Sequence, residues 1–160
     1  MEKAIKTGGS VRNARGSALA EFAPSLLILF LYMFCPLVNL VSLAVGFGAC
    51  MHLNHAQVRE AALLPRSAAE DPNGRVRKGI PEQWKASGLG RFVSPVAGPD
   101  TTLTYRRTEG LDDDMVTVTT SVEMRPTFTL PFFNTIPGLG APVAFRFSTQ
   151  RFVENSVTGR

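Results

Sequence analysis

The apolar residues of this chain are concentrated in one long run near its N-terminus. From Phe22 to Val58 the sequence contains no Lys, Arg, Asp or Glu, and the part up to Met51 is apolar almost throughout. A helix of about 30 residues extends about 45 Å at 1.5 Å per residue, more than a hydrocarbon core of about 30 Å. The pattern predicts a membrane helix in which Pro24 and Pro36 cause kinks rather than ends, since no water competes for the freed carbonyls.

The helical pattern continues beyond the apolar run to about Leu64, where Pro65 ends it. Its last part is expected to be amphipathic and to extend into water, with a stripe at Met51, His55, Val58 and Ala62 and with Asn54, Gln57 and Arg59 elsewhere around the helix. Residues 1–16 are polar and basic without apolar periodicity, which is typical of a disordered leader. The helix is therefore expected over residues 17–64.

Residues 65–160 are rich in Pro, Gly, Thr and Arg and predict a small β-rich domain. Residues 65–80 are expected to be turn and loop, and a short helix is expected over 81–86, before Gly88. Alternation predicts strands over 101–107, 115–124 and 143–152, with a turn over 110–114 and an irregular apolar loop over 128–140. The second strand places Val116, Val118, Val122 and Met124 on one face. The fold class is thus α+β, with a three-stranded antiparallel sheet packed on the upper half of the long helix.

One carboxylate, Glu21, stands at the entrance to the apolar run. A charge costs about 2.5–3.5 kcal/mol at the centre of a bilayer and less near its interface, so a function is expected to depend on Glu21. A basic leader precedes it, and Gly16 closes that leader five residues earlier. This combination at this spacing resembles the class III signal of type IV pilins and pseudopilins.

A second resemblance is narrower. The segment from Ser17 to Pro24, SALAEFAP, is similar to the A-x-x-E-F-A-x-x-[LP] opening of TadE-like proteins, the minor pseudopilins of tight-adherence pili. Arg59-Glu60-Ala61-Ala62 resembles the segment that follows the membrane in that family, and the later strands and the Gly138-Leu139-Gly140 stretch are consistent with it. The resemblance is strong over residues 12–62 and weak afterwards. Ser17 departs from the aromatic first residue of major type IVa pilins, and the chain is longer than major tight-adherence pilins.

The resemblance implies a set of processing and assembly roles. A prepilin peptidase would cut between Gly16 and Ser17 on the cytoplasmic side, where Gly lets an extended backbone approach the protease. The Glu21 carboxylate would pair with the new amine of Ser17 on a neighbouring subunit and register the helices. Expected partners are other pilus subunits and pseudopilins, the inner-membrane assembly platform and membrane lipid. The protein would be a single-pass inner-membrane protein with a cytoplasmic N-terminus and a periplasmic C-terminal domain over 65–160.

The net charge of +4 does not indicate nucleic-acid binding, because the basic residues form no single patch. Those of the leader are explained by topology, since Lys and Arg beside a spanning helix stay cytoplasmic: Lys3, Lys6, Arg12 and Arg15. No phosphate-binding loop, nucleophile elbow or HExxH motif occurs, so neither catalysis nor a cofactor is expected. His52 and His55 are close along a helix but lack a third ligand for zinc, so no metal site is expected.

The main alternative is a signal-anchored periplasmic or envelope binding module that is never cleaved. A lipoprotein interpretation of Cys50 is disfavoured, because the apolar run before it is far longer than the apolar core of a signal peptide, which has about 7–15 residues. Cys35 and Cys50 are separated by about 22 Å of helix, which excludes a disulfide within the helix and favours two small buried apolar residues. Trp84 and the Phe132-Phe133 pair are expected in the core.

Overall fold

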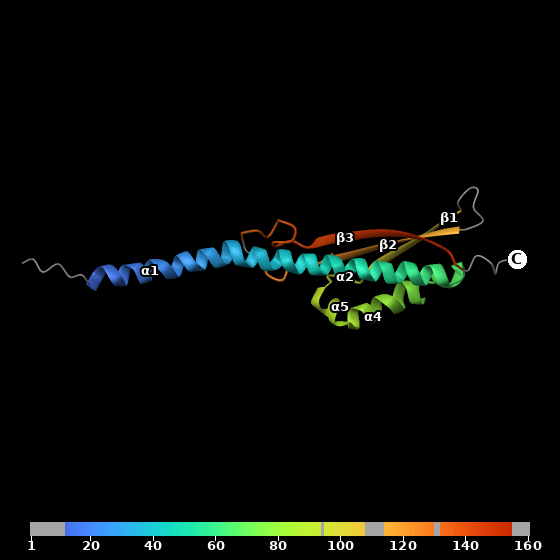
Figure 1. Cartoon of the computed structure of the whole chain (residues 1–160), viewed down its shortest axis with the longest axis horizontal. Coiled ribbons are helices and arrows are strands. Elements are labelled where there is room, and N and C mark those ends of the chain that lie inside the picture. The colour runs from blue at the N-terminus through green and yellow to red at the C-terminus, as the bar shows by residue number, and fades with distance from the viewer. Residues whose placement is uncertain (1–11, 94, 108–113, 130–131, 155–160) are drawn as a thin grey trace, which may run out of the picture.

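One continuous helical rod runs along most of the molecule, and a small domain covers only its C-terminal half (Figure 1). The computed structural model describes residues 12–93, 95–107, 114–129 and 132–154. The rod consists of α1 (Arg12–Leu29), the π-helical turn η1 (Phe30–Phe34) and α2 (Cys35–Leu63). The fold is α+β, as predicted: a long N-terminal helix and a small antiparallel sheet.

Neither proline ends the rod. Pro24 lies inside α1, and Pro36 occupies the first turn of α2, directly after η1. Within η1 the N–H of Cys35 donates to the carbonyl of Phe30, five residues back. Because Pro36 has no N–H and its ring crowds the carbonyl of Tyr32, the wider π-helical turn lets the helix pass the proline without breaking.

The start of the rod differs from the prediction, while its end agrees. The helix begins at Arg12 rather than Ser17, so the last part of the proposed leader is helical; residues 1–11 lie outside the described residues. A helix that already exists can be extended without a new nucleation step. Arg12, Ala14 and Arg15 have high helix propensity, which favours this extension. At the other end Leu63 is the last helical residue, and Leu64 takes an extended backbone before Pro65.

The sheet has the predicted strands. β1 (Asp100–Arg107), β2 (Asp114–Met124) and β3 (Val143–Phe152) form an antiparallel sheet in the order β1-β2-β3. Leu103 pairs with Val118, and Val122 pairs with Phe145. The apolar face of β2 is buried as predicted, through Val116, Val118, Val122 and Met124. The predicted turn before β2 lies outside the described residues, except for Asp114, which begins the strand.

The buried face of α2 matches the predicted stripe only in part. Val58 and Ala62 are buried as predicted, whereas Met51 and His55 are exposed, and Asn54 and Gln57 are completely buried. The buried face follows a helical spacing through small and polar residues: Gly46, Ala49, Cys50, Leu53, Asn54, Gln57, Val58, Ala61 and Ala62. Small side chains let β2 and β3 approach the helix closely. The sheet supplies hydrogen-bond partners for Asn54 Nδ2 and for Gln57, whereas Asn54 Oδ1 is buried without one.

The segment predicted as loop over 65–80 is mostly helical, which corrects that prediction. It contains α3 (Arg66–Glu70) and the π-helical turn η2 (Arg75–Gly79), joined by the predicted turn at residues 71–74. The N–H of Asn73 donates to Asp71 Oδ1 at 2.9 Å in that turn. Ala69 and Val76 are fully buried. Packing of these side chains in the tertiary structure stabilises the two short helices, although the local sequence favours turns.

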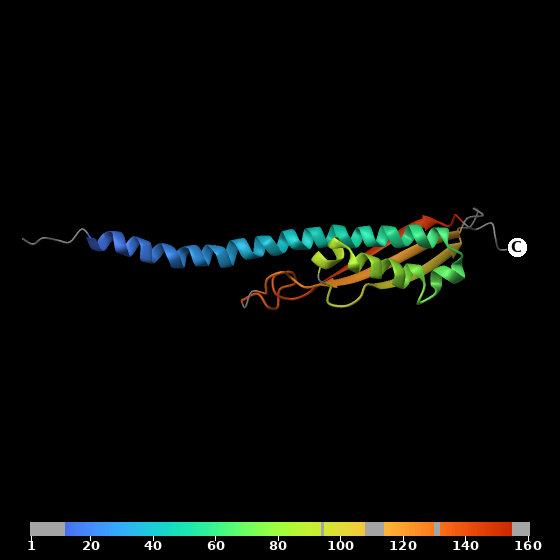
Figure 2. The same ribbon diagram turned by 90° about the horizontal axis from the view of Figure 1, so that it is seen from below.

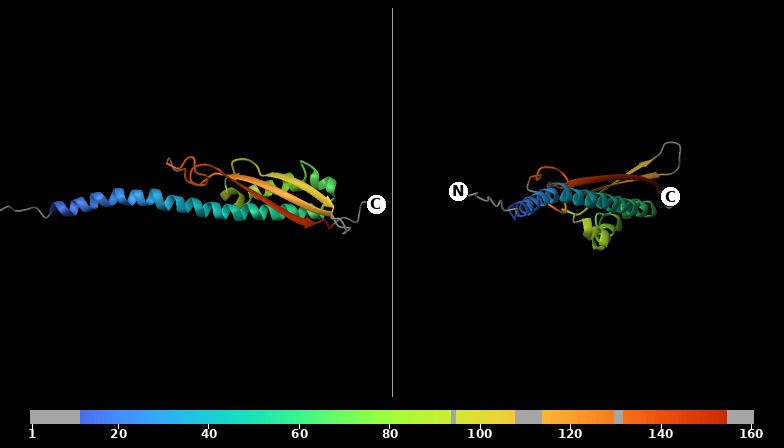
Figure 3. Two further views of the ribbon diagram at one scale, coloured as in Figure 1. Left: turned by 90° about the horizontal axis from the view of Figure 1, so that it is seen from above. Right: turned by 60° about the vertical axis from the view of Figure 1, so that its left-hand side comes forward.

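Two further short helices lie alongside α2. They are α4 (Ile80–Ala86), close to the predicted 81–86, and α5 (Gly88–Val93). The sequence does not predict α5, because a Gly just after a helix, here Gly88, indicates its end. The views in Figure 2 and Figure 3 show α4 and α5 beside the C-terminal half of the rod, with no element beside its N-terminal half.

Candidate membrane and assembly segment

The N-terminal half of the rod presents an apolar surface. From Ala20 to Leu29 every residue is exposed, and large side chains such as Phe22, Leu27 and Met33 are 60% exposed or more. Among the described residues one helical stretch, Ala20–Leu63, is long and apolar enough to cross a membrane. A solvent-exposed surface of this composition is the kind that a lipid or protein partner covers.

Gly16, Ser17 and Glu21 all lie on α1. Ser17 and Glu21 are four residues apart, so they occupy the same side of the helix one turn from each other. The side chain of Glu21 is exposed, and its backbone carbonyl accepts a hydrogen bond of 2.8 Å from the hydroxyl of Ser25. The peptide bond between Gly16 and Ser17 lies within the helix, so an extended conformation there requires unwinding of the first turns of α1.

A buried polar network joins α2 to the domain, and it was not predicted. Gln57 Nε2 donates to the carbonyl of Val76 at 2.9 Å and to Thr101 Oγ1 at 2.8 Å, while Gln57 Oε1 accepts from Thr120 Oγ1 at 2.6 Å. Asn54 Nδ2 donates to Thr120 Oγ1 at 2.9 Å. These side chains connect α2, β1, β2 and η2. Polar residues on a helix normally predict a side that faces solvent. One feature of the sequence points the other way: Asn54 and Gln57 recur at the same helical spacing as the small residues of the buried face.

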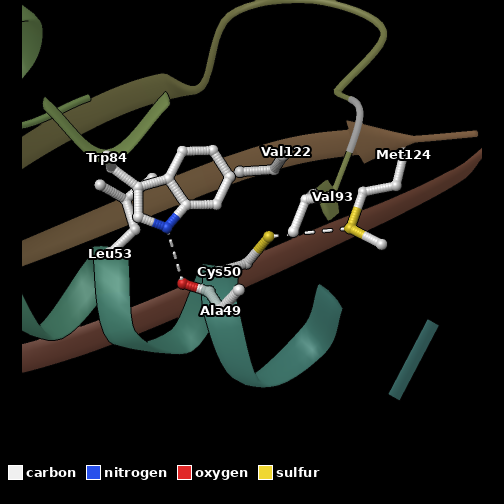
Figure 4. Packing of buried hydrophobic residues seen from close by; sticks show 7 residues of the cluster. All are labelled: Ala49, Cys50, Leu53, Trp84, Val93, Val122 and Met124. Carbon is white, nitrogen blue, oxygen red and sulfur yellow. Dashed lines mark hydrogen bonds between the residues drawn. The ribbon is translucent and has the colours of Figure 1, made fainter. Parts of the chain in front are cut away.

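On the N-terminal side of this network along α2, an apolar cluster packs around Trp84 (Figure 4). The indole Nε1 donates to the carbonyl of Ala49 at 3.1 Å, and Cys50 Sγ lies 3.8 Å from Met124 Sδ. Leu53, Val93 and Val122 complete the cluster. The predictions that Trp84 lies in the core and that both cysteines are buried are confirmed, and neither cysteine forms a disulfide.

The aromatic pair Phe132-Phe133 is not in the core. Phe132 is 70% exposed, and its ring stacks on Tyr32 with centroids 6.1 Å apart. Phe133 meets the same Tyr32 edge-on at 6.1 Å. The prediction of two core residues is therefore wrong for Phe132. The loop that carries the pair reaches past the domain to the exposed half of the rod.

Among the residues that the structure describes, the titratable side chains form no metal-binding cluster. His52 and His55 are exposed on α2, and no three His, Cys, Asp or Glu side chains of the described residues come close enough to share a metal ion. An open groove of about 590 Å³ lies between α2 and α4, and it is lined mainly by apolar side chains such as Leu53, Ile80 and Leu89. Burial raises the pKa of Tyr105, whose ring lies 4.9 Å under the Arg66 guanidinium.

Comparison with protein-family models, with curated proteins and with solved structures finds no match to this chain. The arrangement itself is therefore the basis for a function: an apolar helix with one carboxylate at its entrance, and a domain that leaves most of the N-terminal half of this helix exposed.

Proposed function

We propose that the chain is a TadE-like minor pseudopilin that takes part in the assembly or initiation of a tight-adherence pilus. The observation that carries the proposal is Glu21, an exposed carboxylate at the entrance to an apolar helical surface that the domain leaves uncovered. A carboxylate at that place opposes insertion, so pairing with an amine of a neighbouring subunit would offset the cost of keeping it there.

Processing by a prepilin peptidase would supply that partner. Cleavage between Gly16 and Ser17 creates an amine four residues before Glu21, about 6 Å along the helix axis. A neighbouring subunit displaced along the axis by about that distance brings its amine level with this carboxylate. The pairing would then both neutralise the charge and set the axial step between packed helices.

The division of the rod supports the same role. Its exposed half is available first to lipid and then to neighbouring helices, since both are apolar surroundings. Its covered half holds the sheet through buried contacts, so the domain is carried on a rigid stem. On this proposal the domain faces the periplasm and contacts other pseudopilins or the assembly platform, and the chain is a substrate of the peptidase and not an enzyme.

A second function is an uncleaved, signal-anchored envelope module that binds a ligand. Two observations favour it: the bond between Gly16 and Ser17 lies within a helix, and the groove between α2 and α4 is open and apolar. A bilayer anchor would need the same exposed helix, but it would need neither the new amine of Ser17 nor an axial displacement between packed subunits.

Coexpression with a prepilin peptidase separates the two. We expect intact-mass analysis to show the loss of residues 1–16, with Ser17 as the new N-terminus. The Gly16→Ala variant is expected to remain full length. Gly48→Ala is the matched control, because a side chain at Gly48 meets nothing within 4 Å, and it is expected to be processed normally. Full-length wild-type protein beside a processed pilin substrate in the same cells would refute the proposal.

Registration by Glu21 has its own test. We expect Glu21→Gln to be processed normally but to disappear from pili sheared from cells that carry the assembly machinery. Glu82→Gln, which removes an exposed carboxylate from α4, should leave incorporation unchanged. Equal recovery of both variants in the pilus fraction would exclude the registration role.

A further inference from the structure

The loop between β2 and β3 has an unusual composition for a water-facing part of the domain. Between Arg125 and Arg146 the sequence contains no Asp, Glu, Lys or Arg. Three of its large side chains are well exposed, namely Phe128, Phe132 and Ile136. The views in Figure 1 and Figure 3 show this segment extending from the sheet back along the rod, toward the half that carries no other element.

Hydrogen bonds hold the loop to the rod. Asn39 Nδ2 donates to the carbonyl of Phe128 at 2.8 Å, and the N–H of Phe128 donates back to Asn39 Oδ1 at 2.8 Å. The hydroxyl of Thr127 donates to that of Ser42 at 2.8 Å. Together with the ring contacts on Tyr32, these bonds define the height of the loop along the helix.

That height falls within the thickness of a bilayer. Measured from Phe22 at 1.5 Å per residue, Tyr32 lies about 15 Å and Asn39 about 26 Å along the rod. A hydrocarbon core of about 30 Å that begins at Phe22 ends near Ser42. The helix alone would therefore not span the core before the loop joins it, and the loop lies at the depth of the leaflet nearer to the domain.

The charged residues that flank the loop lie beyond this depth. Arg125 follows Met124, whose side chain packs against Gly46, about 36 Å along the rod from Phe22. Arg146 follows Phe145, whose ring meets that of Phe47 edge-on at 5.7 Å. Both arginines are exposed and stand at the level of the headgroups, where a guanidinium reaches water and phosphate.

Part of the loop backbone is hydrogen-bonded within the protein, which lowers the cost of an environment with little water, where each unpaired N–H or C=O is costly. Asn39 satisfies both backbone groups of Phe128. The carbonyl of Ile136 accepts from Leu139, Gly140 and Ala141 at 3.1 Å, and the N–H of Gly138 donates to Ala141 at 2.9 Å. Pro126, Pro137 and Pro142 have no N–H to satisfy.

We propose that the described part of this loop, residues 126–129 and 132–142, forms a second membrane element, inserted beside the helix into the leaflet nearer to the domain, with lipid acyl chains as its partner. Exposed aromatic and aliphatic side chains then contact lipid, and the flanking arginines lie at the headgroups. The domain would consequently be held against the membrane surface. The inference rests on the membrane residence of the helix and not on cleavage or pilus assembly.

Tryptophan variants of the full chain in vesicles with brominated acyl chains test this. Phe132→Trp reports on the loop, Phe30→Trp on the spanning helix and Thr102→Trp on the exposed side of β1. The signal of the buried Trp84 is measured in the unmodified chain and subtracted. Because bromine quenches only on contact, we expect about twofold or greater quenching at positions 132 and 30 and none at position 102.

The outcomes are distinguishable. Quenching at position 30 without quenching at position 132 overturns the loop proposal and leaves the spanning helix intact. Absence of quenching at both positions refutes the membrane residence on which the proposed function also depends. A residue at position 132 that is shielded from iodide but not quenched by bromine overturns lipid as the partner and indicates a second copy of the chain.

Discussion

Gln57 offers the most direct test of how the domain is attached to the rod. In Gln57→Leu the side chain keeps a similar volume but loses its amide. The change removes three hydrogen bonds of 2.6–2.9 Å, to Val76, Thr101 and Thr120. All three bonds lie at a completely buried side chain, where water cannot replace them.

The size of the effect follows from those contacts. Each intramolecular hydrogen bond contributes about 0.5–1.5 kcal/mol net, and a buried partner left unsatisfied costs about 1–3 kcal/mol. The added apolar contact of Leu offsets part of this loss. We therefore expect Gln57→Leu to lower the free energy of unfolding by about 3 kcal/mol. A double-mutant cycle with Thr120→Val should show a coupling of about 0.5–3 kcal/mol, because Thr120 donates directly to Gln57.

Denaturant unfolding of the full chain in detergent micelles measures this. The chain has one tryptophan, Trp84, and its burial between α2 and the sheet makes its fluorescence a report on their separation. Gln83→Leu, an exposed change on α4, is the control and should stay within about 0.5 kcal/mol of the wild type. If Gln57→Leu stays within the same range, the network does not stabilise the joint and the reasoning fails.

Two further predictions concern the loop and α5. Asn39→Ala removes the bonds to Phe128 and should raise the rate of limited proteolysis within residues 127–141 severalfold, while Asn134→Ala, at an exposed position of the same loop, should not; equal rates would contradict the anchoring role. Gly90→Ala places a Cβ onto the carbonyl of Trp84 and 2.7 Å from Lys85 Cα, so it should destabilise the fold by about 1–3 kcal/mol in the same unfolding assay. Gly88→Ala meets nothing within 4 Å and should have no such cost, so a similar loss in both variants would contradict the packing argument.

The attachment of the domain also bears on the proposed function. A subunit that moves from a membrane into a packed bundle of helices exchanges lipid for protein around the exposed half of the rod. The polar network at Asn54 and Gln57 lies outside that half, so the exchange need not disturb it. The loop at Tyr32 and Asn39, in contrast, covers part of the surface where a neighbouring helix would pack.

Features that depend on short-range patterns were predictable from the sequence alone. The apolar run and Pro65 determine the rod and its end, and the last strand occupies the predicted residues 143–152. Period-two alternation places one set of side chains on each face, so the buried positions of β2 followed directly from the order of its residues. The spacing of Gly16, Ser17 and Glu21 is also visible in the sequence alone. The pairing of Glu21 with the Ser17 amine of a neighbouring subunit is a proposal.

The tertiary structure decided what the long helix buries. Asn54 and Gln57 look like solvent-facing residues until β2, 63 to 64 residues further on, supplies their partners. The helices at Arg66–Glu70 and Arg75–Gly79 depend on burial of Ala69 and Val76 that no local signal contains. The loop meets Asn39 across 89 residues of chain. A polar or aromatic side chain is buried or exposed according to the partners that folding brings to it, and those partners are distant in the sequence.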